Sequence, residues 1–170
     1  MIFLPNDYKK CFEDLFSKKI LPPGMPFYTS SPSVSDKTLA PSGKSTLFAL
    51  VPIPVTNDDG INKFSNKTKE IKKRIFERFN FHGIDLKPEN IEFEKIYTPD
   101  KWRDLYGLYK TSAFGASHNL FNIGPFRNRN MSDKVKGLYY VGASTTPGTG
   151  LPMVTLSGKL VSERILSDIS

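Results

Sequence analysis

The chain has 170 residues, of which 38% are hydrophobic and 24% charged, a composition typical of a globular protein and of neither a disordered nor a fibrous one. Its single cysteine, Cys11, excludes an internal disulfide and a cysteine-based metal site, and no apolar run has the length of a membrane span. The net charge of +7 is compatible with an acidic partner, either nucleic acid or an anionic membrane surface.

The first thirty residues predict two short strands with a helix between them. Residues 2–4 and 26–30 have strand-like patterns, and Asn6-Asp7 provides the cap of a short helix. The helix carries its apolar side chains at helical spacing on one face: Tyr8, Cys11, Phe12, Leu15 and Phe16. Because Cys11 lies on this face, we expect it to pack in the core and not to act as a reactive thiol.

Residues 30–45 are rich in serine, proline and charge, which predicts a surface loop. A strongly apolar strand is predicted at 47–55. Because Pro52 and Pro54 cannot donate to a ladder, we expect it to lie at the edge of a sheet or to end in a bulge. Residues 57–60 predict a turn. Ser42-Gly-Lys-Ser-Thr46 resembles the end of a phosphate-binding loop, but Thr38 stands where that motif requires glycine and a strand follows it, so we exclude this function.

The densest positive charge lies between Lys63 and Arg78. Ile71, Ile75 and Phe79 recur four residues apart in this region, which predicts an amphipathic helix with a basic polar face. Two pairs at helical spacing, Glu70 with Arg74 and Lys73 with Glu77, support the helix. We interpret the charge as a solvated face, since no base-reading or stacking motif accompanies it, and contact with a membrane surface stays open.

Downstream, residues 91–97 predict a strand, and Thr98-Pro99 predicts the start of a helix that ends near Gly107. The two histidines do not predict a metal site. His82 is expected to be exposed. His118 lies in a segment of small and aromatic residues, 112–121, and we interpret it as a structural residue, with Phe121, Ile123 and Phe126 suiting the wall of an apolar pocket.

The richest pattern is residues 137–154, where a predicted buried strand at 138–141 enters a turn and a helix begins at once. Gly142, Gly148 and Gly150 free the backbone to approach another group closely, and Pro152 suits the first turn of the helix. A helix N-terminus behind a glycine turn presents free N–H groups, which favours binding of an anion or a dipole.

Together these blocks resemble the phytoene desaturase family of bacterial and fungal type, FAD-dependent enzymes related to the amine oxidase flavoproteins. The blocks that carry the resemblance are Tyr97–Arg103, Ser112–Asn119, Gly124–Arg127 and Gly137–Val154, with shorter matches at Asn6–Tyr8, Ala40–Gly43 and Leu50–Pro54. The resemblance implies a mixed α/β chain that forms the C-terminal part of a two-domain FAD-dependent oxidoreductase and lacks its N-terminal dinucleotide-binding βαβ unit. It further implies that residues 1–115 are part of the substrate-binding domain and residues 116–170 close the FAD-binding domain.

The implied function is FAD-dependent desaturation of phytoene or a related C40 carotenoid, with this chain inactive alone. The residues implied to contact FAD are Gly142, Ala143, Ser144, Thr145, Gly148, Gly150, Leu151, Pro152, Met153 and Val154. Those expected to line the substrate pocket are Phe114, His118, Phe121 and Phe126. No catalytic acid or base is assigned. Behind the turn, Val154, Val161 and Ile165 are expected to face inward.

The chain departs from the family at three positions, where the family often has histidine at Thr146, proline at Asn128 and glycine at Thr111. We expect an intracellular protein with peripheral membrane contact, because a C40 hydrocarbon partitions into lipid, and no nucleic-acid partner. Two alternatives stay open: a related flavin amine oxidase or carotenoid isomerase, and a non-catalytic basic module that binds membrane or nucleic acid.

Overall fold

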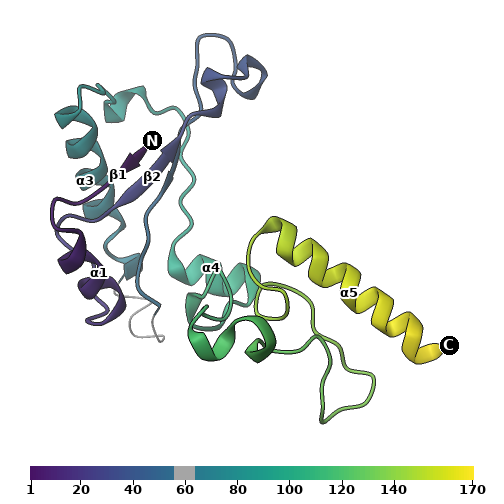
Figure 1. Cartoon of the computed structure of the whole chain (residues 1–170). Coiled ribbons are helices and arrows are strands. Elements are labelled where there is room, and N and C mark those ends of the chain that lie inside the picture. Colours follow the sequence, from purple (N-terminus) through teal and green to yellow (C-terminus); the bar gives the residue numbers. More distant parts are fainter. Residues whose placement is uncertain (56–63) are drawn as a thin grey trace. The chain divides into compact units, whose positions relative to one another are not determined.

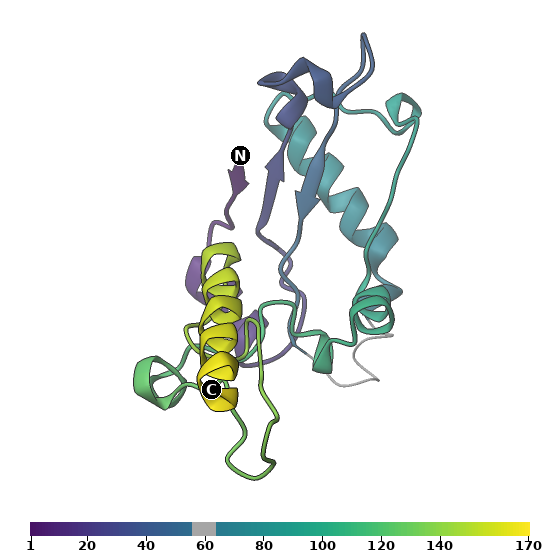
Figure 2. The same ribbon diagram turned by 90° about the vertical axis from the view of Figure 1, so that its right-hand side faces the viewer.

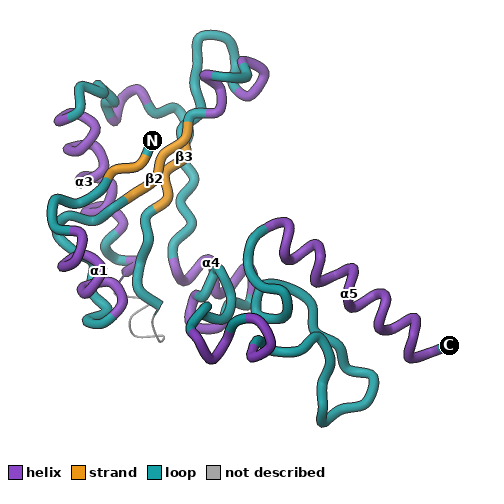
Figure 3. The backbone as a smooth tube through the Cα atoms, viewed as in Figure 1, coloured by secondary structure: helices purple, strands orange, loops and turns teal. Residues whose placement is uncertain are grey.

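The computed structural model describes residues 1–55 and 64–170, so the turn predicted at 57–60 and Lys63 lie outside the described residues. The predicted mixture of helix and sheet is confirmed, with a small three-stranded sheet and several helices (Figures 1 and 3). The chain divides into two compact units, Met1–Leu105 and Tyr106–Ser170, which we call the first and the second unit. The boundary predicted after residue 115, between a substrate-binding part and an FAD-binding part, stays a prediction.

Among its described residues, the first unit contains the sheet and several helices. Its strands are β1 (Ile2–Phe3), β2 (Phe27–Ser30) and β3 (Phe48–Leu50), and its helices are α1 (Tyr8–Phe16), α3 (Thr68–Phe81), the short 3-10 helix Pro88–Asn90 and α4 (Pro99–Tyr106), which closes the unit. All strand pairs are antiparallel in the order β1-β2-β3, with Phe3 opposite Phe27 and Thr29 opposite Ala49. Two further 3-10 turns, Pro32–Val34 and Lys37–Leu39, interrupt the loop predicted at 30–45.

The predicted edge position of the third strand is confirmed, but its predicted length is wrong. The ladder ends at Leu50, because Pro52 and Pro54 lack the N–H groups that would extend it. Val51 and Ile53 beyond the ladder still pack partly buried against the core. In the apolar run at 47–55, the residues that pack against the core therefore extend beyond the residues that pair in the sheet.

Aromatic side chains from the sheet and α3 make the core of the first unit. The rings of Phe3 and Phe27 stack with centroids 4.3 Å apart, and Phe79 of α3 meets Phe3 edge-on at 5.4 Å. All three side chains are at most 3% exposed. Figure 2 shows α3 running along one face of the sheet, as the predicted amphipathic pattern requires. Burial of each such side chain contributes about 1.5–3 kcal/mol.

Helix α1 only partly follows its predicted face. Asp7 caps it, with the carboxylate accepting from the Lys10 amide at 2.9 Å, and Cys11 and Leu15 are buried as expected. Three aromatic side chains of the predicted face, those of Tyr8, Phe12 and Phe16, are more than half exposed. They recur every four residues and contact one another instead, with the Phe12 and Phe16 centroids 4.3 Å apart.

The predicted strand at 91–97 is wrong, because side-chain ion pairs hold this segment in place of a ladder. Glu92 pairs with Lys44 and Glu94 pairs with Lys72 at 2.6 Å, while Phe93 between them is 82% exposed. The helix predicted from Pro99 is confirmed as α4. Pro99 is its first residue, and the Ser65 hydroxyl donates to the Asp100 carboxylate in its first turn.

The second unit is mostly loop (Figure 3) and has one long helix, α5 (Leu151–Ile169), as predicted. The buried strand predicted at 138–141 is wrong. Within Tyr106–Ser170, which is described throughout, its strand pairing is one bridge between Tyr139 and Met131, and Leu138, Tyr140 and Val141 are 39–59% exposed. None of the described helices is both long enough and apolar enough to span a bilayer.

Candidate functional site

The candidate site is the glycine turn, residues 142–150, which leads from the Tyr139 bridge into α5. Its three glycines have φ values of +119° (Gly142), +146° (Gly148) and +107° (Gly150), a region that side chains with a Cβ avoid. The positive φ therefore explains why glycine is needed at each of these three positions.

Arg127 holds the turn from behind. Its side chain is only 3% exposed, and its guanidinium donates to four backbone carbonyls from three segments. Nε binds the Thr145 oxygen at 2.9 Å and Nη1 binds the Asn122 oxygen at 3.0 Å. Nη2 donates to the oxygens of Ala116, at 3.3 Å, and of Ala143. The planar fork of an arginine suits such a set of fixed acceptors.

A second buried polar group ties the turn to α5. The Asn130 amide nitrogen lies 2.9 Å from the Thr146 oxygen and 3.0 Å from the Ser157 hydroxyl of α5. That hydroxyl, which is fully buried, also accepts from the Gly142 amide at 3.2 Å and lies 3.0 Å from the Thr145 hydroxyl. Because buried polar groups need partners, this network fixes the turn relative to the helix.

The combined result is that each carbonyl of the turn from residue 142 to 146 accepts a hydrogen bond from inside the second unit. The donors are the Thr145 amide and hydroxyl for Gly142, Arg127 for Ala143 and Thr145, Asn128 for Ser144, and Asn130 for Thr146. In a trans peptide group the N–H points away from the C=O. The amides of Ala143 and Ser144 belong to the same peptide groups as the bonded Gly142 and Ala143 carbonyls and point away from those bonds. The amides of Gly142, Thr145 and Thr146 are themselves bonded within the unit, to the Ser157 hydroxyl and to the Gly142 and Asn128 oxygens. Within residues 142–146 the turn therefore offers an electron-rich group at most the amides of Ala143 and Ser144.

The glycines serve two different purposes. A Cβ on Gly148 would lie 3.0 Å from Nε2 of His118 and 3.6 Å from Nε of Arg127, so internal packing requires this glycine. The same holds for Gly115, where a Cβ would lie 2.9 Å from the Ala143 carbonyl carbon. At Gly142 and Gly150 a Cβ would meet nothing within 4 Å. These two positions leave the backbone open to the close approach of another molecule.

The N-terminus of α5 adds to this open surface. Gly150 precedes the helix, and the first helical bond runs from the Val154 amide to the Gly150 oxygen at 2.9 Å. The amides of Leu151 and Met153 precede that bond, and Pro152 has none to satisfy. Leu151 is 83% exposed, so the positive end of the helix dipole is accessible from outside the second unit.

The predicted cofactor contacts divide into an inner and an outer group. Thr145 and Gly148 are buried, and their neighbours Arg127, Asn130 and His118 are residues of the unit itself. The others are half-buried or exposed: Gly142, Ala143, Ser144, Gly150, Leu151, Pro152, Met153 and Val154. As predicted, Val161 is buried, and Val154 and Ile165 are half-buried. The FAD contacts themselves stay predictions.

The four predicted substrate-pocket residues are not gathered in one place. Phe126 contributes to the wall of an open hollow of about 940 Å³ that also includes Arg127, Tyr140 and Val141. Phe114 and Phe121 are 68% and 86% exposed and lie outside its lining. His118 sits against Gly148. The assignment of these four residues to a substrate pocket stays a prediction.

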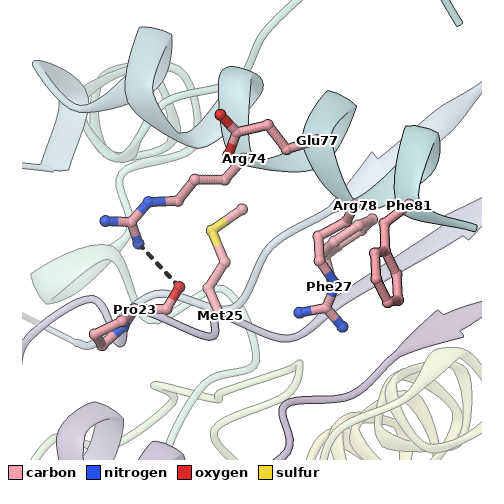
Figure 4. A pocket seen from close by; sticks show the side chains of 7 residues that line it. All are labelled: Pro23, Met25, Phe27, Arg74, Glu77, Arg78 and Phe81. Carbon is pink, nitrogen blue, oxygen red and sulfur yellow. Dashed lines mark hydrogen bonds between the residues drawn. The ribbon is translucent and has the colours of Figure 1, made fainter.

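A smaller hollow of about 280 Å³ lies in the first unit, between α3 and the segment that leads into β2 (Figure 4). The Arg74 guanidinium beside it donates to the Pro22 and Pro23 oxygens at 3.1 and 3.5 Å and pairs with Glu70. Arg78 donates to the Leu4 oxygen at 2.8 Å. Both cations are thus committed to the fold, which makes this hollow a weaker candidate for an anionic ligand.

Further cations of the basic face of α3 also have partners within the chain. Lys67 pairs with Glu70, and Lys73 pairs with Glu77. The pairing predicted at helical spacing is therefore present. Paired cations contribute less to an electrostatic surface than free ones, so the geometry does not favour the basic-module alternative.

Sequence reasoning missed Arg127, Asn130 and Ser157 as determinants of the site. Arg127 appeared only as part of a family block, and polar residues in a loop are ordinarily exposed. The local signal was the clustering of Arg127 and Asn130 directly after the Gly124-Pro125 turn. Among the described residues, no group of three or more His, Cys, Asp or Glu side chains is placed to bind a metal ion.

No family model matches the chain. Among curated proteins, the zeta-carotene-forming phytoene desaturase of Myxococcus xanthus is 40% identical over 163 residues, which cover 95% of this chain and 31% of that protein. The phytoene desaturase of Fusarium fujikuroi is 33% identical over 98% of this chain and 32% of its own length. The neurosporene-forming phytoene desaturase of Rhodobacter capsulatus is 34% identical over 93% and 30%. The chain thus spans about a third of the length of the curated relatives it matches, and the predicted resemblance is confirmed.

Proposed function

We propose that this chain, a partial homologue of the phytoene desaturases, is the flavin-facing C-terminal part of an FAD-dependent carotenoid desaturase. The reaction is an oxidation of CH–CH bonds of phytoene or a related C40 polyene. The βαβ unit that binds the ADP half of FAD would come from elsewhere in the enzyme, because the chain carries no such motif.

The observation that carries this proposal is the glycine turn as a whole: its carbonyls from Gly142 to Thr146 are all bonded inside the second unit, while Gly142, Gly150 and the N-terminus of α5 stay open. An isoalloxazine ring is electron-rich along its pyrimidine edge and becomes more so on reduction. A backbone surface with its carbonyls withdrawn, two open glycines and an accessible helix N-terminus suits such a group.

The chain's own residues have separable roles in this scheme. FAD, when bound, supplies the acceptor for the hydride removed from a saturated carbon. Gly142 and Gly150 admit the ring close to the backbone, and the α5 N-terminus orients it. The exposed side chains of Phe114, Phe121 and Phe126 supply apolar surface for a hydrocarbon substrate.

The test uses the gene product that contains this chain, produced in cells supplied with phytoene. We expect a yellow protein with bound FAD and conjugated carotenoids in the extract. Gly150→Val should abolish both, whereas Gly83→Val is the matched control, since it also has a positive φ and an open Cβ position but lies in the first unit. Equal effects of the two variants would refute the role of the turn.

A related expectation concerns the chain alone. Because it supplies one wall of the FAD site, the purified 170-residue chain should not retain FAD through gel filtration. A stoichiometric yellow flavoprotein would contradict this division of the site.

We also propose that the enzyme is intracellular and contacts a membrane peripherally. Support comes from apolar side chains that the second unit leaves exposed, among them Leu120 at 77% and Phe121 at 86%. Vesicle co-sedimentation should be retained at high salt, because apolar contact resists screening. Replacement of both residues by serine should abolish it, whereas Lys69→Ser on the α3 face should not.

A further inference from the structure

We propose that Arg127 is a positioning residue whose buried positive charge raises the affinity of the glycine turn for the reduced, more negative form of the flavin. This inference rests on the proposed function, since it concerns the same turn. It assigns to Arg127 an electrostatic role in addition to its hydrogen bonding.

The first argument is that the charge of Arg127 is buried without a counter-charge. Its side chain is 3% exposed, and none of the ion pairs among the described residues involves it. A buried guanidinium is usually matched by a carboxylate, because desolvation of a charge costs several kcal/mol. Here the partners are four neutral carbonyls, which satisfy the N–H groups and leave the net charge in place.

The second argument is the position of that charge directly behind the candidate site. Two of the four acceptors are the Ala143 and Thr145 oxygens of the turn. A Cβ on Gly148 would lie 3.9 Å from Cζ of Arg127 and 3.0 Å from Nε2 of His118, so the backbone of the turn at Gly148 lies close to the guanidinium, with the His118 ring beside it. Within a protein interior a charge acts over this range with little screening.

The third argument concerns why an arginine is needed at all. Carbonyls 116, 122, 143 and 145 could be satisfied by neutral donors, as Asn130 satisfies Thr146 in the same unit. A cation costs more to bury than an amide, and an electron-rich ligand on the far side of the turn would offset that cost.

The consequence can be expressed as a reduction potential. Reduction of bound flavin by two electrons and one proton adds one negative charge. A nearby fixed positive charge favours that form and raises the two-electron midpoint potential. A tenfold change in relative affinity of the two forms corresponds to about 30 mV.

The test compares Arg127→Gln with Arg127→Lys in the flavin-loaded gene product that contains this chain. Both side chains donate to carbonyls, but only lysine keeps the charge. We expect the Gln variant to have a midpoint potential about 30 mV lower or more, and at least about tenfold weaker sulfite binding, since the sulfite adduct is anionic. The Lys variant should retain most of both. Arg129→Gln removes an exposed guanidinium that pairs with Asp133, so it is the matched charge control and should leave the potential near that of the unmodified protein.

The outcomes are distinguishable. An unmodified protein without flavin would overturn the proposed function. Retained flavin with equal potentials in the unmodified and Gln proteins would overturn only the role of Arg127. If the Gln variant does not retain flavin, flavin affinity becomes the readout: loss in Gln but not in Lys supports the charge, and equal loss in both refutes it.

Discussion

The two units of this chain bury opposite kinds of side chain, mainly apolar in the first unit and polar in the second. The first unit buries phenylalanines, with Phe3, Phe27 and Phe79 in mutual contact, and pairs its cations on the surface. The second unit buries Arg127, Asn130, Thr145 and Ser157, and Val161 is the one buried apolar side chain among its residues. Its large apolar side chains, such as Phe121 and Leu151, lie outside.

The difference teaches how each unit holds its shape. An apolar core tolerates local rearrangement, because dispersion contacts are non-directional. A core of hydrogen bonds fixes specific peptide groups in specific orientations. The second unit thus gives up hydrophobic burial and gains a backbone surface of defined polarity. Apolar groups left outside are available for other parts of an enzyme or for substrate.

The largest effect is expected in the apolar core of the first unit. Phe27→Ala removes a side chain that is 1% exposed and should lower the unfolding free energy of the first unit by about 3–5 kcal/mol. Urea unfolding followed by fluorescence of Trp102, the single tryptophan, measures this. Phe93→Ala, at an 82% exposed position, is the control and should change little. Similar losses in both would mean that the core lies elsewhere.

The corresponding change in the second unit is Ser157→Ala. It removes a fully buried hydroxyl and leaves the Gly142 amide and the Asn130 side chain short of a partner, which should cost about 1–3 kcal/mol. Hydrogen exchange of residues 139–150 should accelerate accordingly. Ser162→Ala on the exposed side of the same helix should have no such effect. Unchanged exchange in Ser157→Ala would show that hydrogen bonds do not hold the turn.

A third substitution is expected to stabilise the second unit by relieving backbone strain at Thr111. Thr111 has φ of +58°, an outlier for a β-branched residue, at a position where the family often has glycine. Thr111→Gly should therefore stabilise the second unit by roughly 0.5–1 kcal/mol after the entropy cost of glycine. Ser112→Gly, where φ is −75°, should destabilise it. A loss in Thr111→Gly would contradict the strain at this position.

The smallest expected effect is electrostatic and belongs to the first unit. Hydrogen bonds from Ser65, and next from Thr98, hold the pKa of Asp100 below its usual value. The pKa is therefore lower in the folded than in the unfolded state, so the stabilisation is present above about pH 4 and is lost as the pH falls. Asp100→Asn and Ser65→Ala should each flatten the acid limb of the stability curve by well under about 1 kcal/mol. The difference from the unmodified protein should be present near pH 7 and disappear at low pH, so a loss of stability as large at about pH 2 as at about pH 7 would be inconsistent with this origin.

Features set by local chemistry were predictable from the sequence. Asp7 as the cap of α1, Pro99 at the start of α4 and the glycine-proline entry into α5 all depend on residues within one turn of the chain. The amphipathic pattern of α3 was also sufficient, since Phe79 at the end of its stripe is buried.

Features that depend on distant partners were not predictable. Residues 91–97 and 138–141 have strand-like composition, but a strand needs a neighbour, and in this chain ion pairs and a single bridge take its place. The burial of Arg127 depends on carbonyls as far as 18 residues away, and no side-chain pattern encodes where a carbonyl will point. Hence the sequence located the glycine turn but not the residues that set its polarity.

Recognition of main chain by Arg127 and Asn130 has an evolutionary consequence. Arg127 binds only carbonyl oxygens, and Asn130 adds two hydroxyls to its carbonyl acceptors, so neither interaction depends on the side chains of Ala143, Ser144 or Thr146. Ser144 and Thr146 nevertheless use their side chains within the unit, since the Ser144 hydroxyl accepts from the Ala116 amide and the Thr146 hydroxyl donates to the Asn128 oxygen. Ala143 is therefore the position of the three at which the side chain can diversify while the path of the backbone is preserved.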